Sequence, residues 1–76
     1  MAQPFQISRS RCSVLSDPSL RREIQAHTES EAETSSILRS IGRFGNDLSI
    51  RYYELTPVVR RRPQGASSSW TVRAMR

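Results

Sequence analysis

The sequence predicts a mostly disordered chain with α-helical elements and no stable globular core. Leu, Ile, Val and Phe together make up only 16 of its 76 residues, close to the level at which disorder is expected. The single cysteine, Cys12, cannot form an internal disulfide, so this short chain has no covalent cross-link to stabilise it. One long amphipathic stretch, residues 36–55, stands out from this background and is expected to form the main helix.

Residues 1–16 are expected to form a disordered N-terminal tail. They contain no acidic residue, and Pro4 and several serines interrupt any helical stripe. The same composition, poor in acids and rich in serine and with Arg9 and Arg11, is also typical of a mitochondrial presequence.

A short helix is expected at about residues 17–28. Asp17 can cap its first free amides, and Pro18 suits the first turn because a proline there loses no hydrogen bond. Leu20 and Ile24 lie four residues apart and therefore share one face. Two apolar residues make a narrow face, so this helix is expected to fray when isolated.

The next stretch, residues 29–35, is polar and rich in glutamate, and two interpretations of it stay open. It forms either an acidic solvated linker or an N-terminal extension of the main helix, whose dipole favours carboxylates at that end.

Residues 36–55 carry apolar side chains at the spacing of one helical face, and Pro57 is expected to end the helix. Gly42 and Gly45 lie inside this stretch, and each weakens a helix by about 1 kcal/mol relative to alanine. Glycine in such a place often marks the close approach of another chain. We therefore expect a segment that folds only when it docks into a partner's groove. Its apolar stripe consists of Ile37, Ile41, Phe44, Leu48, Tyr52 and Leu55.

Residues 56–76 are expected to form a basic disordered tail. It contains the polybasic run at residues 60–62 and a tryptophan, Trp70, that is followed closely by Arg73. Arginines beside an interfacial aromatic residue favour weak contact with an anionic membrane.

The composition also limits the classes of function. Every basic residue is an arginine and the net charge is +5, which favours acidic partners. No apolar run is long enough to span a membrane, and no Cys and His cluster has metal-ligand spacing, so no cofactor is expected. No set of nucleophile, base and metal ligands can be recognised, so an enzyme is not expected.

Residues 37–52 read ILRSIGRFGNDLSIRY. The stretch has four apolar positions, the third of which is followed by a small residue and then by two polar ones. This order resembles the BH3 motif of the Bcl-2 family, in which four hydrophobic anchors enter a groove and an acid follows the small residue. The partner-binding residues that the resemblance implies are Ile37, Ile41, Phe44, Gly45, Asn46, Asp47, Leu48, Arg51 and Tyr52.

The resemblance implies a pro-apoptotic ligand of the BH3-only class, or a truncated form of a larger family member. Its partners would be pro-survival Bcl-2 family proteins, or transiently Bak or Bax. It would be cytoplasmic and would associate with the mitochondrial outer membrane. No specific nucleic acid is expected on this interpretation.

Two other functions stay open at the level of sequence. One is a small arginine-rich nucleic-acid-binding protein that uses Tyr52, Tyr53 and Trp70 as stacking platforms. The other is a helical subunit that completes the bundle of another protein with the same apolar stripe.

Overall fold

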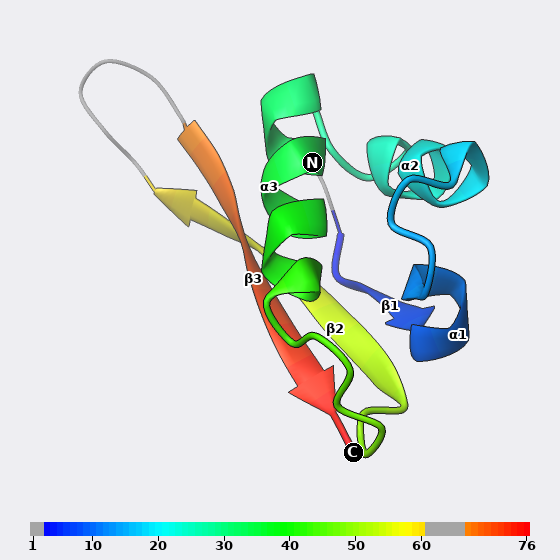
Figure 1. Ribbon diagram of the computed structural model, residues 1–76. Coiled ribbons are helices and arrows are strands. Elements are labelled where there is room, and N and C mark those ends of the chain that lie inside the picture. The colour runs from blue at the N-terminus through cyan, green and yellow to red at the C-terminus, as the bar shows by residue number, and fades with distance from the viewer. Residues whose placement is uncertain (1–2, 61–66) are drawn as a thin grey trace.

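The computed structural model describes residues 3–60 and 67–76, which form helices packed against an antiparallel sheet (Figure 1). In chain order the elements are β1 (Phe5–Ser8), α1 (Arg9–Cys12), α2 (Pro18–Gln25), α3 (Glu31–Gly42), β2 (Tyr52–Arg60) and β3 (Ser67–Met75).

The sheet has the order β1-β2-β3, with both pairs antiparallel. In the first half of β2, Tyr53 lies opposite Ile7 of β1 and Ala74 of β3, so this half is the centre of the sheet. The pairing with β1 ends at Leu55. Pro57 therefore lies where β2 has only β3 as a neighbour, the kind of position at which a strand tolerates proline.

Side-chain hydrogen bonds start α2 and α3, and a glycine turn follows α3. The Asp17 carboxylate accepts a hydrogen bond from the Ser19 amide at 2.8 Å and starts α2. The Ser30 hydroxyl accepts from the Glu33 amide at 3.2 Å and starts α3. After α3, Gly45 takes a left-handed conformation with φ of 57°, which a residue with a Cβ adopts at a cost. The chain thus leaves the helix at a sequence-encoded turn.

The helices cover one face of the sheet, and α3 runs across β3 (Figure 1). Strand residues alternate between the faces, so every second residue of β1 and β2 points toward the helices. The core between the two layers consists of Ile7, Cys12, Leu20, Ile24, Ile37, Leu38, Ile41, Ile50, Tyr53 and Leu55.

The predicted fold class is wrong, because these residues form a core of their own instead of a mostly disordered chain. Two of the buried side chains, Ile24 and Leu55, have no exposed surface. The expectation of no stable core counted the apolar residues but not their placement. Eight of the counted residues converge on one layer together with Cys12 and Tyr53. The sheet that gathers them pairs residues near the N-terminus with residues beyond position 50.

The expected helix at residues 36–55 is also wrong. It begins earlier, at Glu31, and ends at Gly42, and the chain is a strand from Tyr52 onward. The expectation failed because apolar residues in this stretch fit two periods at once. Tyr52 and Leu55 continue the helical spacing, whereas Tyr53 and Leu55 have the spacing of a strand with one buried face.

The remaining segments differ from their sequence-based descriptions as follows. Residues 1–16 contain β1 and α1 in place of a disordered tail. The short helix expected at 17–28 corresponds to α2, and the glutamate-rich stretch contributes the first turn of α3. Most of residues 56–76 belongs to β2 and β3, while residues 61–66, with part of the polybasic run, lie outside the described residues.

Among residues 3–60 and 67–76, no helix has the length and apolar character needed to cross a membrane.

Candidate functional site

The first two implied anchors lie inside this chain's own core. Ile37 is 1% exposed and Ile41 is 3% exposed, both on the side of α3 that faces the sheet. Their neighbour Leu38 is also buried. The apolar face of this helix is therefore packed in the core, with β3 and α2 as neighbouring elements, and none of these three side chains is free to enter a groove.

The structure separates the other two anchors from that face. Phe44 is half-buried after the end of α3 and packs on Tyr53, with ring centroids 5.5 Å apart. Leu48 is 82% exposed in the turn that leads to β2. Gly45, the proposed small residue, makes the left-handed turn, and a Cβ there would meet no atom within 4 Å. The close approach is instead at Gly42, whose Cβ would lie 3.3 Å from Leu15 Cδ1.

The polar residues of the implied site lie around the same turn. Asn46 is exposed, and Asp47 accepts hydrogen bonds from the hydroxyl and amide of Ser49 at 2.6 and 3.0 Å. Those bonds lower the pKa of Asp47 from its ordinary value. Arg51 is exposed, and Tyr52 begins β2 half-buried.

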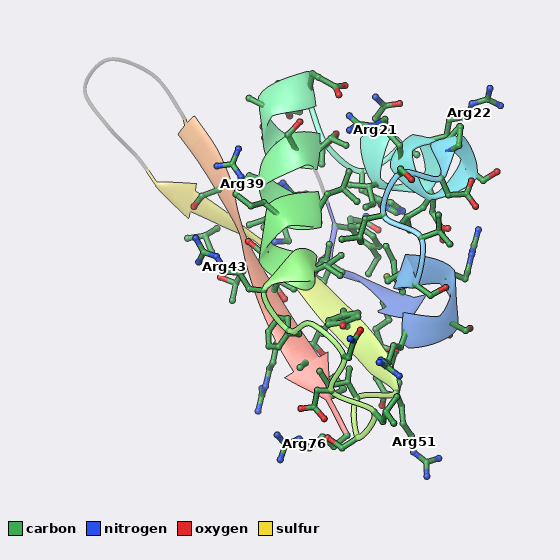
Figure 2. All side chains as sticks on the ribbon, in the orientation of Figure 1. Arg21, Arg22, Arg39, Arg43, Arg51 and Arg76 are labelled. Atoms are coloured by element: carbon green, nitrogen blue, oxygen red, sulfur yellow. The ribbon has the colours of Figure 1, made fainter. Side chains whose placement is uncertain are left out.

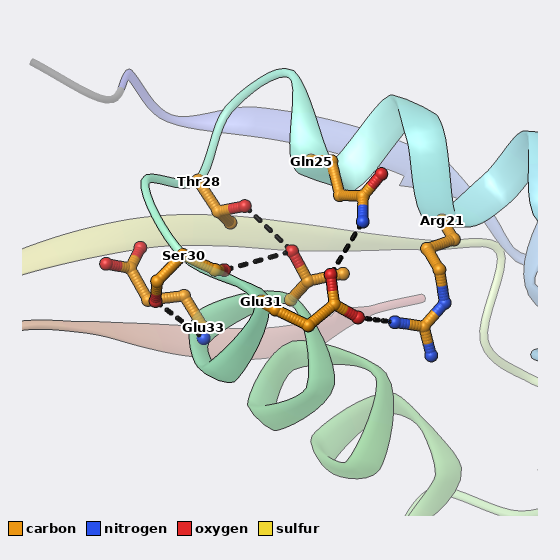
Figure 3. A network of polar contacts seen from close by, with 7 residues as sticks. Arg21, Gln25, Thr28, Ser30, Glu31 and Glu33 are labelled. Atoms are coloured by element: carbon orange, nitrogen blue, oxygen red, sulfur yellow. Dashed lines mark hydrogen bonds and ion pairs between the residues drawn. The ribbon is translucent and has the colours of Figure 1, made fainter.

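Most carboxylates lie near the start of α3 or on α2, and one of them, Glu31, links these two helices (Figure 3). Glu31 pairs with Arg21 and accepts a hydrogen bond from Gln25 at 2.7 Å. Glu33 accepts one from the indole N–H of Trp70 at 2.9 Å. Glu31 and Glu33 at this end of the fold are thus engaged in internal contacts.

The other end of α3 is basic. We call Arg39, Arg43, Arg51 and Arg76 the arginine strip. Figure 2 shows Arg39 and Arg43 on the same side of α3, with Arg51 and Arg76 beyond its C-terminal end. All four are exposed. Within the described part of the chain, only Arg76 has a carboxylate within ion-pair distance, Asp47 at 3.6 Å.

A pocket of about 270 Å³ opens beside this strip, between α1, the end of α3 and β2. Its polar lining includes Arg9 and Asn46, and its apolar lining includes Leu15, Ile41 and the ring of Tyr53. A backbone hydrogen bond connects a residue that lines the pocket with a residue of the arginine strip, because the Arg9 amide donates to the Arg51 carbonyl at 2.9 Å.

Burial keeps the Cys12 thiol and the Tyr53 hydroxyl in this pocket protonated. It raises the pKa of the Cys12 thiol to about 11, with a further contribution from the charge of Glu23. Burial also raises the pKa of Tyr53, although a hydrogen bond with Arg9 opposes that shift. Both groups are therefore neutral near pH 7, and Cys12 has little of the thiolate that a nucleophile needs.

The face of the sheet away from the helices is open in Figure 1. Alternation places Tyr52 and Glu54 of β2 on this face, next to Met75 and Arg73 of β3. Arg73 is exposed. Among the described residues of β2 and β3, this face therefore carries the Tyr52 ring and Arg73, with the Glu54 carboxylate on the residue opposite Arg73.

Sequence reasoning missed Arg9 and Cys12, which it placed in a disordered tail. The only local signal was that Arg9 lies in a segment without acids. In the described residues, no three His, Cys, Asp or Glu side chains converge as metal ligands would. Comparisons with family models, with curated proteins and with solved structures find no significant match.

Proposed function

We propose that this chain binds single-stranded nucleic acid through the arginine strip and the open face of the sheet. The observation that carries the proposal is the uneven distribution of charged side chains between the two ends of α3. Carboxylates are engaged around the start of α3, whereas Arg39, Arg43 and Arg51 at the other end make no ion pair among the described residues. Guanidinium groups that have no carboxylate partner are suited to phosphate, which they bind in a planar, bidentate manner.

The open sheet face favours a single strand over a duplex. Unstacked bases bind to aromatic rings and arginine planes, which Tyr52 and Arg73 provide on this face. Of the three aromatic residues first considered as platforms, Tyr53 is 2% exposed and Trp70 packs edge-on against Phe5 at 5.6 Å. Tyr52 is therefore the ring that we assign to base stacking.

The test is the salt dependence of binding to a fluorescent single strand of about 12 nucleotides, within the roughly 4–16 nucleotides that small binding folds cover. Three or four phosphate contacts give a slope of about −2 to −3 in log affinity against log salt, that is, a loss of about 20- to 50-fold between 50 and 200 mM.

The variant Arg39→Gln should reduce that slope by about 0.7. The matched control is Arg22→Gln, which removes the same charge from α2, away from the strip, and breaks no ion pair among the described residues. Tyr52→Leu should weaken binding by about fivefold or more, since base stacking contributes about 1–3 kcal/mol per base. No binding, a slope near zero, or equal effects of the two arginine variants would contradict the proposal.

The pro-apoptotic assignment and its link to the mitochondrial outer membrane stay predictions. For α3 to enter a groove it would have to leave the sheet and expose Ile37, Leu38 and Ile41. The burial of each of these side chains stabilises the fold by about 1.5–3 kcal/mol. The same applies to a role in completing another protein's bundle. Binding of the full chain to a purified pro-survival protein, with loss of its near-ultraviolet circular dichroism, would support the death-ligand prediction.

A further inference from the structure

The outer edge of the sheet at β3 carries backbone groups that no neighbouring strand covers. β3 is the last strand in the order β1-β2-β3, so among the described residues it pairs only with β2. We propose that this edge binds an extended acidic segment of another protein, which adds to the sheet as a further strand. Its acidic side chains lie beside Arg73, and its apolar ones lie beside Val72 and Ala74. This inference goes beyond nucleic-acid binding and does not depend on it.

The strand pairing determines which backbone groups of β3 face this edge. The Arg51 carbonyl accepts a hydrogen bond from the Arg9 amide at 2.9 Å, so it points to the side of β1, and the next amide, that of Tyr52, points to β3. Tyr52 is paired with Met75, and backbone groups alternate in direction from one strand residue to the next. Every second residue before Met75 therefore faces β2, and the residues between them face outward. These are Trp70, Val72 and Ala74, and we call their N–H groups the edge amides.

The other side of the sheet is less suited to a further strand. The pairing of β2 with β1 ends at Leu55, and Pro57 faces the gap beyond it without an amide to donate. The strand β1 itself has only 4 residues. β3, by contrast, has 9 residues, no proline and Arg73 as its only charge. A long edge without these protections is the kind to which an extended peptide adds.

The side chains of β3 indicate what kind of peptide fits. Val72 and Ala74 are half-buried and pack against the core on the side of the helices. Apolar side chains of an added strand would lie next to them and extend the core. Arg73, between them in sequence, is exposed on the open face. The pattern that matches both faces is an alternation of acidic and apolar residues.

Charge favours an acidic peptide over a second copy of this chain. Arg73 makes no ion pair among the described residues, although Glu54 lies opposite it on β2. Arg39 and Arg43 extend from α3 on the side away from α2 (Figure 2), and α3 packs on β3, so both add positive potential near this edge. A second copy would bring a further net charge of +5 to the same place. Because the open face is also assigned to nucleic acid, the peptide and the strand should compete for Arg73.

The test uses a peptide of about eight residues, a usual strand length, in which glutamate and valine alternate. One matched peptide has lysine in place of every glutamate. The other has proline in place of every valine, which keeps the charge but removes the amides that would pair with β3. Hydrogen exchange is followed by NMR in the ¹⁵N-labelled 76-residue chain. The edge amides should exchange fast in the free chain and slowly with the glutamate–valine peptide, whereas the amides of Thr71 and Arg73, which face β2, should be slow in both.

Two variants measure the contribution of charge. Arg73→Gln should weaken binding of the glutamate–valine peptide about two- to fivefold, as the loss of one cross-strand pair of opposite charges does. Arg22→Gln removes the same charge from α2 and should leave binding unaltered. Arg73 is exposed, so its substitution keeps the fold.

The outcomes separate this proposal from its alternatives. Slower exchange of the edge amides with the glutamate–valine peptide alone would support it. No effect of that peptide, or equal binding of the proline peptide, would overturn strand addition. Edge amides that are already protected in the free chain and lose protection on dilution would place a second copy at the edge and would also overturn it. If the peptide binds as expected and the nucleic acid does not, the edge proposal stands and the proposed function fails.

Discussion

Replacing Ile37 by alanine is expected to remove a large share of the stability of this fold. The side chain is 1% exposed, so the change deletes three fully buried carbons. At about 0.8 kcal/mol per buried carbon the transfer contribution alone is about 2.4 kcal/mol, and the cavity left behind brings the expected loss into the range of about 2–5 kcal/mol. A domain of 76 residues has a total free energy of unfolding of about 4–11 kcal/mol.

Urea denaturation followed by tryptophan fluorescence measures this loss. With a slope near 1 kcal/mol per molar urea, the midpoint should fall by about 2–5 M. Leu48→Ala is the matched control, because Leu48 is 82% exposed and its truncation should change the free energy of unfolding by less than about 0.5 kcal/mol. Both residues are implied anchors of a groove-binding helix. If the wild-type chain shows no cooperative transition, or if the two variants unfold alike, the reasoning is refuted.

Three further predictions follow from single residues. Gly45→Ala should lower the free energy of unfolding by about 1 kcal/mol because φ is 57° there, and Gly45→Asn by less; equal losses in urea melts would speak against the left-handed turn. The pKa of Asp47 should lie below its ordinary value of 3.8 when it is followed by carbon-detected NMR. Because folding lowers this pKa, the contribution of Asp47 to stability is present above the unfolded-state pKa and is lost as the pH falls through the folded-state pKa. Asp47→Asn should flatten that part of the acid denaturation curve, and an unchanged curve would argue against this role of Asp47. Cys12, whose pKa burial raises to about 11, should react with iodoacetamide at pH 8 far more slowly in the native chain than in urea. The free energy of unfolding should also decline as the pH rises above the pKa of the thiol in the unfolded chain. Labelling of the native chain as fast as in urea would contradict the burial of Cys12.

The sequence was most informative where structure is local. Asp17 and Pro18 indicated the start of a helix, and the structure places α2 there with the Asp17 carboxylate on the Ser19 amide. Such signals need only neighbouring residues, because a cap bonds to amides two or three positions away. The two interpretations of the glutamate-rich stretch included the one in which it extends α3.

The sheet was not predictable in the same way. Pairing of Ile7 with Tyr53 joins distant parts of the chain, and no local pattern in either strand specifies that partner. Short strands also leave little trace: β1 has 4 residues, and only one of them is buried. The aromatic and β-branched residues of β2 were a strand signal, but the helical spacing of Tyr52 and Leu55 led to the opposite interpretation.

For the candidate site, the residue types were recognised but not their arrangement. Gly45 and Asn46 were singled out as parts of a partner-binding helix, whereas the structure places them at a turn that borders a pocket. The counterpart across that pocket, Arg9, lies on α1. Only a fold that brings α1 to the end of α3 reveals that the two sequence regions share a wall.

The most direct test of the central claim is an NMR measurement on the free 76-residue chain. The account places Tyr53 between Ile7 and Ala74 in an antiparallel sheet, so strong nuclear Overhauser effects are expected across the strands on both sides of Tyr53. Unbroken helical contacts between residues three apart from position 42 through 55, or no long-range contacts at all, would contradict it.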